Sequence, residues 1–209
     1  MATPDDVLKH EKPTACACQA RGGGGGARAG NRRGRLTAQT HPRAAYLCEM
    51  TDNSFGVEFL EFEIKDYDTA RSFFHVHKPA DEPPIDFAAI PKEHEDAYRT
   101  INYVFPTDFL RCKTVRTALV FRVGQEEVKD FRMIERHYFK NKLIRSYDFT
   151  FGFCIPNSTN SWEAIYPVPE RTPEEIAEFQ ASPNGHRSDS FYFVGDKLIM
   201  HNKAMYNYN

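Results

Sequence analysis

The chain has 209 residues, of which 41% are hydrophobic and 13% aromatic, enough for one domain with a sizeable core. Its net charge of −2 argues against a dedicated nucleic-acid binder, and no apolar run approaches the roughly 18 residues of a membrane span. The 5 cysteines have no regular spacing, which fits a reduced, cytosolic compartment better than a disulfide framework. Cys16 and Cys18 have no second pair beside them, so we expect no metal there.

The charge is unevenly distributed along the chain. Residues 1–45 hold eight Lys or Arg and three acidic residues, whereas residues 46–209 are acidic overall. Residues 11–44 include five consecutive glycines and almost no large apolar side chain, so they cannot bury enough surface to offset their ordering entropy. We therefore predict a disordered basic arm over residues 1–45, a solvated tail rather than a segment that contacts RNA or acidic lipid. The folded domain is expected over residues 46–209.

From Tyr46 onward the hydrophobic pattern favours β-structure. We expect strands, in chain order, at residues 57–64, 72–77, 101–105, 117–123, 128–139 and 145–155, followed by a hairpin over 190–206. The apolar phase slips between Phe59 and Phe62, as a β-bulge would cause. Residues 81–100 read as a loop, with several prolines and a charged run.

One short helix is expected after Thr172, because a capping Thr precedes Pro173 and a glutamate stands at the third helical position. About eight strands and one helix predict an all-β, antiparallel sandwich.

Aromatic residues recur at alternate positions and exceed what a core of this size needs. Tyr147, Phe149, Phe151 and Phe153 share one face of the strongest strand. The wider aromatic set is Phe59, Phe62, Phe105, Phe109, Phe121, Phe191 and Phe193. Polar residues are interleaved with it, namely Tyr103, Glu135, His137, Ser190, Tyr192 and Tyr206. A solid core and a ligand cavity both remain open, but buried hydroxyls and a carboxylate favour a pocket.

The chain offers little that points to catalysis. His75, His77 and Glu82 resemble half of a cupin metal site, but the cupin glycine positions hold Thr69 and Ala89, so surface histidines are the better interpretation. No serine elbow, Walker loop or dinucleotide fingerprint is present.

Cys112 and Cys154 lie within apolar strands and are expected to be buried structural thiols. We expect no enzyme activity, no metal and no cofactor.

Three long runs carry a resemblance to a known family. FRMIERHYF (131–139), SYDFTFGFCIP (146–156) and SDSFYFVGDKLIMHNKA (188–204) resemble the lipid-binding chaperones related to the GMP-phosphodiesterase delta subunit, in their Unc branch. The similarity extends over residues 46–208. It implies an immunoglobulin-like β-sandwich with a hydrophobic cavity between its sheets.

The resemblance also implies a function. Members of this branch sequester the N-myristoyl group of cargo proteins and carry them through the cytosol to membranes, including those of cilia. A GTP-bound Arf-like small GTPase releases the cargo. A monomer with only transient membrane contact, without nucleic acid or cofactor, is expected in the cytoplasm and in cilia or flagella.

The resemblance places two groups of residues at the lipid. The apolar group along the acyl chain is Phe59, Phe62, Ile64, Phe105, Phe109, Val115, Phe121, Met133 and Tyr147. The polar group near the pocket, some of it contacting the first backbone amides of the cargo, is Tyr103, Glu135, His137, Ser190, Tyr192 and Tyr206.

Two departures from the family pattern keep alternatives open. Residues 11–44 separate PDDVL from the YLC that usually follows it closely, and the loop at 156–162 is closer to the delta subunit, which carries prenylated C-termini. A prenyl carrier and a cavity-free protein-interaction sandwich are the alternatives.

Overall fold

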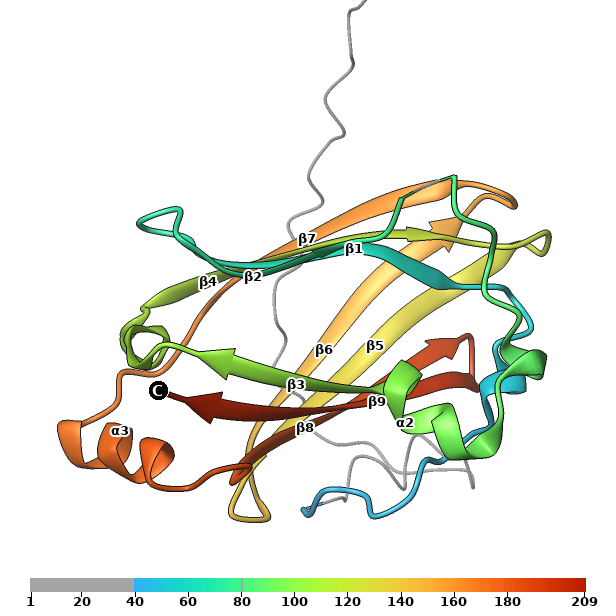
Figure 1. Cartoon of the computed structure of the whole chain (residues 1–209). Helices are drawn as coiled ribbons and strands as arrows, with labels where there is room; N and C mark the ends of the chain where they lie inside the picture. The colour runs from blue at the N-terminus through green and yellow to red at the C-terminus, as the bar shows by residue number, and fades with distance from the viewer. Residues whose placement is uncertain (1–39, 80) are drawn as a thin grey trace, which may run out of the picture.

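The structure, a computed structural model, describes residues 40–79 and 81–209. The described strands are β1 Glu58–Asp66, β2 Ser72–His77, β3 Thr100–Phe105, β4 Thr114–Arg122, β5 Val128–Phe139, β6 Lys142–Cys154, β7 Thr159–Pro167, β8 His186–Val194 and β9 Lys197–Tyr208. They form sheet A, in the order β2-β1-β4-β7, and sheet B, in the order β3-β9-β8-β5-β6. Figure 1 shows the two sheets packed face to face. None of the helices in this part of the chain is long and apolar enough to cross a membrane.

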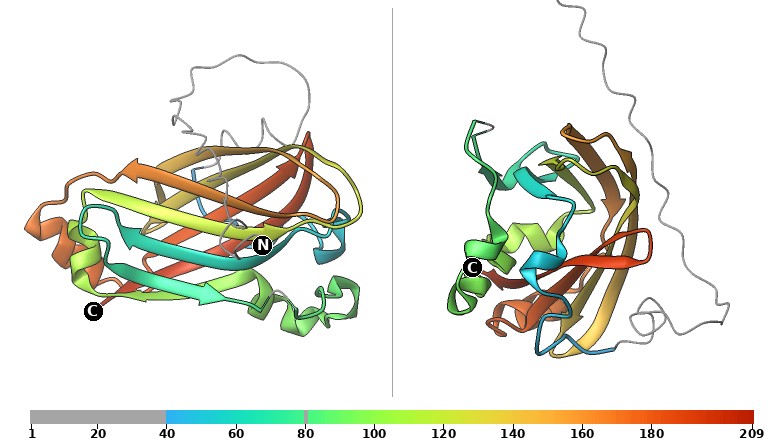
Figure 2. Two further views of the ribbon diagram at one scale, coloured as in Figure 1. Left: turned by 90° about the horizontal axis from the view of Figure 1, so that it is seen from above. Right: turned by 90° about the vertical axis from the view of Figure 1, so that its right-hand side faces the viewer.

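The expected all-β sandwich is confirmed, with one parallel strand pair. Neighbouring strands are antiparallel except β3 and β9, which run parallel from Thr100–Lys203 to Phe105–Tyr208. β2 and β3 are consecutive in sequence but lie in different sheets, at edges that face each other (Figure 2). Because a crossover rather than a hairpin brings β3 to sheet B, it can pair in parallel.

The predicted helix is present as α3, Pro173–Gln180. Thr172 and Glu175 form the expected capping box: the Thr172 hydroxyl accepts from the Glu175 amide at 3.2 Å, and the Glu175 carboxylate accepts from the Thr172 amide at 2.8 Å. Phe179 is buried and stacks on Phe139 with ring centroids 3.9 Å apart. The helix therefore closes one end of the sandwich.

Two elements were not predicted. β7 pairs with β4 along its whole length, but its sequence carries only Trp162 and Tyr166 as large inward residues and follows a turn-rich segment. The expected loop at 81–100 contains 3-10 turns at Phe87–Ala89 and Lys92–His94 and a short helix, α2, at Glu95–Arg99. The charged run there is not fully solvated, because α2 buries an ion pair between its two terminal residues.

Register shifts occur in several strand pairs, and two of them bear on the predicted faces of strands. The expected bulge in β1 is confirmed by a register shift between Phe59 and Glu61. A second one in β6, around Gly152 at φ +90°, was not anticipated. Beyond it Cys154 is buried and Phe153 is 55% exposed, so the expectation that Phe153 shares the inner face was wrong.

The outer face of sheet B carries a core of its own. Phe191 and Phe193, expected among the cavity candidates, are fully buried there with Ile134 and Leu198. Residues 43–49, the N-terminal strap, lie across this face, and Cys48 is part of the core. The basic arm predicted over 1–45 falls outside the described residues except for 40–45, which contact sheet B at several points.

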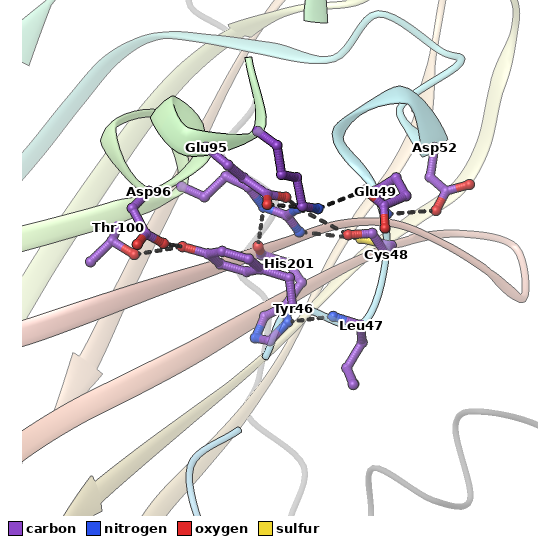
Figure 3. Close-up of polar contacts among 11 residues, drawn as sticks. Tyr46, Leu47, Cys48, Glu49, Asp52, Glu95, Asp96, Thr100 and His201 are labelled. Atoms are coloured by element: carbon purple, nitrogen blue, oxygen red, sulfur yellow. Dashed lines mark hydrogen bonds and ion pairs between the residues drawn. The ribbon is translucent and has the colours of Figure 1, made fainter. Parts of the chain in front are cut away.

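Polar contacts from α2 and β9 fix the strap. Figure 3 shows Tyr46 directed at Asp96 and Thr100, with its hydroxyl 2.6 Å from the carboxylate and 2.7 Å from the Thr hydroxyl. The Arg99 guanidinium lies 3.9 Å from the Tyr46 ring centroid and donates to the Cys48 carbonyl at 2.9 Å. These contacts make α2 a clamp on the strap.

His201 joins the strap to sheet B through a hydrogen bond that only the neutral imidazole can accept. The Leu47 amide donates to Nδ1 at 3.1 Å, so this nitrogen carries no proton, and Nε2 faces the Asp189 carboxylate at 3.1 Å. Burial lowers the pKa of His201 from its ordinary 6.5 despite Asp189, and the charges of Lys203 and Arg99 lower it further. His201 is therefore neutral, and a second proton would oppose the Leu47 amide.

We expect stability to fall on acidification because of this contact. The folded pKa of His201 lies below the unfolded one, so the unfolded chain binds more protons between the two values. Stability that is present above about pH 6.5 is therefore lost progressively as the pH falls below 6.5 toward the lowered folded pKa. His201→Asn keeps an acceptor near Nδ1 and cannot titrate. Urea midpoints between pH 7.5 and 5.5 should fall less steeply in this variant than in the parent.

The control for this experiment is His94→Asn, the same change at an exposed histidine away from the strap. It separates the loss of an imidazole as such from the loss of the contact with Leu47. Equal slopes for His201→Asn and the parent would show that another group, such as the buried His186, governs the acid transition.

Candidate functional site

A cavity lies between the inner faces of the two sheets, in two adjoining chambers. The central chamber has a volume of about 170 Å³ and the distal chamber about 110 Å³, far above the roughly 10–15 Å³ that one water needs. The residues that line both are Phe62, Tyr103, Thr117, Glu135, Tyr166 and Tyr206. The two chambers therefore lie next to each other along the sandwich.

The structure brings most of the predicted site residues to this space. Those at the central chamber are Phe59, Phe62, Tyr103, Met133, Glu135, Ser190, Tyr192 and Tyr206. The distal chamber adds Ile64, Phe109, Val115, His137 and Tyr147. They lie on β1, β3, β4, β5, β6, β8 and β9, or follow β3. The alternation of side chains and the family resemblance together predicted them.

Phe105 and Phe121 line neither chamber. Phe105 is 1% exposed and packs behind the wall, with its ring 4.3 Å from Phe109. Phe121 is equally buried and packs against Phe131 at 5.5 Å. Both belong to the solid core around the cavity rather than to its surface.

Several lining residues were missed. Trp162 and Tyr166 come from the unpredicted β7, and their alternation with Ala164 is the signal that could have found them. The others are Val76, Ile101, Leu110, Thr117, Leu119, Ile144, Arg145, Val168, Arg171, His186, Ser188, Asn202, Lys203, Ala204 and Tyr208. About half of them are polar or charged, which hides these inward-facing positions from a hydrophobic pattern.

Several polar side chains of the distal chamber are hydrogen-bonded to one another. His137 Nδ1 lies 3.1 Å from His186 Nε2, and the other ring nitrogen of His186 contacts the Tyr208 hydroxyl. Arg145 donates to the Tyr147 hydroxyl at 2.9 Å. Paired groups of this kind do not require a ligand to hydrogen-bond them.

His186 is held neutral within this group. Burial lowers its pKa well below the ordinary 6.5, and the charges of His137, Arg171 and Arg145 act in the same direction. A neutral imidazole adds no fixed charge to the wall. An apolar chain can therefore lie against it at little electrostatic expense.

Two tyrosines of the central chamber differ from these paired groups. Tyr103 and Tyr192 are 5% and 8% exposed, and neither hydroxyl has a hydrogen-bond partner among residues 40–79 and 81–209. Burial, with Glu135 in support, raises the pKa of each, so both hydroxyls keep their protons. They are free donors facing an apolar space, beside Ser190, whose hydroxyl lies 3.4 Å from the Glu135 carboxylate.

Apolar side chains stand where the edges of the two sheets face each other. Val76 on β2 is 50% exposed and Ile101 on β3 is 40% exposed, and both line the central chamber. The chamber is thus open on the side of β2 and β3. On the opposite side the rings of Phe149 and Trp162 meet at 5.0 Å and narrow the gap.

The chemistry of the cavity is that of binding. Among the described residues no group of three or more His, Cys, Asp or Glu is arranged to hold a metal ion. His75 lies outside the cavity, on β2, where its Nε2 is 2.8 Å from Glu61. Cys112 and Cys154 are buried, as predicted, and burial raises the pKa of both thiols. An apolar space with a few convergent donors suits a ligand with an alkyl part and a polar end.

Comparisons with known proteins agree with this description. A family model described as "GMP-PDE, delta subunit" matches residues 51–208. Protein unc-119 homolog B-A of Xenopus laevis is 45% identical over 164 residues, which are 78% of this chain and 68% of that protein. Protein unc-119 of Caenorhabditis elegans is 42% identical over 164 residues, covering 78% and 73% of the two chains.

Removing the free and the paired hydroxyls should have different effects on stability. Tyr103→Phe and Tyr192→Phe remove groups without a partner, so the free energy of unfolding should stay within about 0.5 kcal/mol of the parent. Tyr206→Phe takes away the contact at 3.1 Å to Ser188 and leaves that buried hydroxyl unsatisfied. It should destabilise by about 1–3 kcal/mol in urea unfolding. A comparable loss in all three variants would mean that the first two hydroxyls have partners.

Proposed function

The chain belongs to the GMP-PDE delta subunit family, a lipid-binding carrier family rather than an enzyme family, and from this premise we propose that it carries N-myristoylated proteins. It sequesters the acyl group, keeps the cargo in solution in the cytoplasm and delivers it to membranes, including those of cilia. A GTP-bound Arf-like small GTPase releases the cargo. The chain acts as a monomer without a cofactor.

The observation that supports this proposal is the combination of an apolar cavity with free hydroxyl donors. The phenylalanines of the cavity offer ring surface to an alkyl chain, whereas Tyr103 and Tyr192 offer donors to a carbonyl. An N-terminal acylated glycine has this composition, since an amide follows the alkyl chain. The similarity of the chain to unc-119 proteins is consistent with a lipid-binding carrier.

Energetics explain why the polar end matters. Burying an acyl chain contributes about 0.8 kcal/mol per CH₂, which amounts to roughly 10 kcal/mol for a myristoyl group before the association terms. A bilayer offers the same chain nearly the same gain. The preference of the carrier for one cargo therefore depends on the polar contacts, each contributing about 0.5–1.5 kcal/mol.

Fluorescent peptides that differ only in their lipid test the proposal. A myristoylated N-terminal peptide should bind much more tightly than a farnesylated C-terminal peptide in side-by-side titrations. Phe109→Asp places a charge in the distal chamber and should weaken myristoyl binding at least a hundredfold.

Phe153→Asp, the same change at an exposed position of β6, is the matched control and should leave the affinity unchanged. Tighter binding of the farnesylated peptide would make the chain a prenyl carrier. If no lipid bound while a small GTPase did, the protein-interaction module would be the correct function.

A GTPase can release the cargo only if it binds one conformation of the carrier more tightly than the other. A ligand that binds the empty or reshaped sandwich more tightly lowers cargo affinity by its coupling free energy. Adding an Arf-like GTPase with a GTP analogue should accelerate dissociation of a fluorescent myristoylated peptide in stopped flow. The same GTPase with GDP should not, and equal rates would contradict this step.

A further inference from the structure

A third cavity continues the line of the two chambers at the other end of the sandwich. This end cavity has a volume of about 170 Å³ and lies between the start of β1, the middle of β9, and the segments around α2. Its apolar lining consists of Met50, Val57, Phe59, Ile85, Phe87, Ile199 and Met200. It shares Phe59 and Asn202 with the central chamber, and Tyr98, at its rim, is 52% exposed.

One strand connects the three spaces in order. Met200 lines the end cavity, and Asn202 lines both the end cavity and the central chamber. Ala204 lines the central chamber, Tyr206 lines the central and distal chambers, and Tyr208 lines the distal chamber. At about 3.3 Å per residue this face of β9 spans roughly 26 Å. α2 and α3 lie toward opposite ends of the sandwich, near the end cavity and the distal chamber respectively (Figure 1).

The difference between hydrogen-bonded and free polar groups indicates which way a ligand lies along the three cavities. In the distal chamber the imidazoles, Tyr208 and Tyr147 are hydrogen-bonded to neighbours, so an alkyl chain can lie against them without breaking these hydrogen bonds. The free hydroxyls of Tyr103 and Tyr192 lie in the central chamber. A ligand with an alkyl tail and an amide is accommodated best with the tail in the distal chamber and the amide in the central one.

Asn202 lies where the peptide part of a ligand would pass from the central chamber into the end cavity. Its side chain is half-buried at the junction of the central chamber and the end cavity, and no hydrogen bond to its amide group is found in the described part of the chain. It lies opposite Ser190 in the β8–β9 pair. A free carboxamide offers both a donor and an acceptor, as a peptide backbone requires.

We propose that the end cavity is a peptide subsite, which receives an apolar side chain of the cargo a few residues after the acylated glycine while Asn202 hydrogen-bonds the backbone. This inference rests on the proposed function and adds a determinant of cargo choice to it. The apolar part of the lining selects a residue such as leucine over a small one. The side chain is buried beyond Phe59, which lines both spaces.

A set of myristoylated peptides tests the subsite. N-myristoylglycinamide carries the lipid and one residue, whereas fluorescent hexapeptides carry alanine at positions 2–6 or leucine at one of positions 3–6. At one or two adjacent positions leucine should bind roughly tenfold more tightly than alanine. Asn202→Ala should weaken every hexapeptide roughly three- to tenfold.

Two tryptophan variants distinguish the routes by which the peptide can leave. Ile85→Trp fills the end cavity and should abolish the preference for leucine without changing the affinity for N-myristoylglycinamide, measured by displacement of a fluorescent fatty acid. Val76→Trp narrows the open side between β2 and β3, the alternative route, and should keep the preference for leucine over alanine whatever its effect on the overall affinity. Thermal melting, with the smaller Ile85→Phe as a second filling variant, verifies the fold.

Each contrary result has a distinct meaning. Loss of the leucine preference in Val76→Trp but not in Ile85→Trp would place the peptide between β2 and β3 and overturn the subsite. Weaker binding of N-myristoylglycinamide to Ile85→Trp would put the alkyl chain in the end cavity and reverse the direction. No leucine preference in the parent would also overturn the subsite, whereas failure of the parent to bind N-myristoylglycinamide would overturn the carrier function itself.

Discussion

Aromatic contacts between the two sheets hold the cavity open, and the rest of the structure depends on them. At one end Phe121 of sheet A meets Phe131 of sheet B with ring centroids 5.5 Å apart. At the side of β2 and β3, Phe74 meets Tyr103 edge-on at 4.9 Å. Rings are rigid and bulky, so contacts at the margins of a sandwich keep its sheets from closing over the middle. Space for a ligand therefore follows from where the rings meet.

Both faces of sheet B are apolar and have to be covered, which explains why the strap lies on its outer face. Its inner face lines the cavity, while Phe191 and Phe193 of β8 bury themselves on the outer face. The N-terminal strap covers that outer face and is held by Arg99 and by the neutral imidazole of His201. A change of charge at His201 acts on the cover of the sheet and not on the walls of the cavity.

Much of this arrangement could be predicted from the sequence, for reasons that differ between elements. The alternation in β5, β6 and β8 placed Glu135, Tyr147 and Tyr192 on the inner face, and the local capping chemistry at Thr172 placed α3. β7 could not be predicted as readily, because Trp162 stands among polar and small residues. The alternation of side chains also cannot show which inward ring lines the cavity and which packs against another ring, because that depends on contacts between strands of different sheets. The family resemblance supplied the carrier function, which periodicity alone left open.

Under the proposed function, the balance between carrier and membrane is decided by a small part of the contact. The alkyl chain gains about 0.8 kcal/mol per CH₂ in either environment, so its burial hardly distinguishes them. Free donors such as Tyr103 and Tyr192, and the amide of Asn202, add a difference of about 0.5–1.5 kcal/mol each. Coupling free energies between binding sites are usually about 1–3 kcal/mol, which is the same size as a few of these contacts. A GTPase therefore needs only to displace the polar end of the cargo from β3, β8 and β9 for the membrane to become the preferred environment.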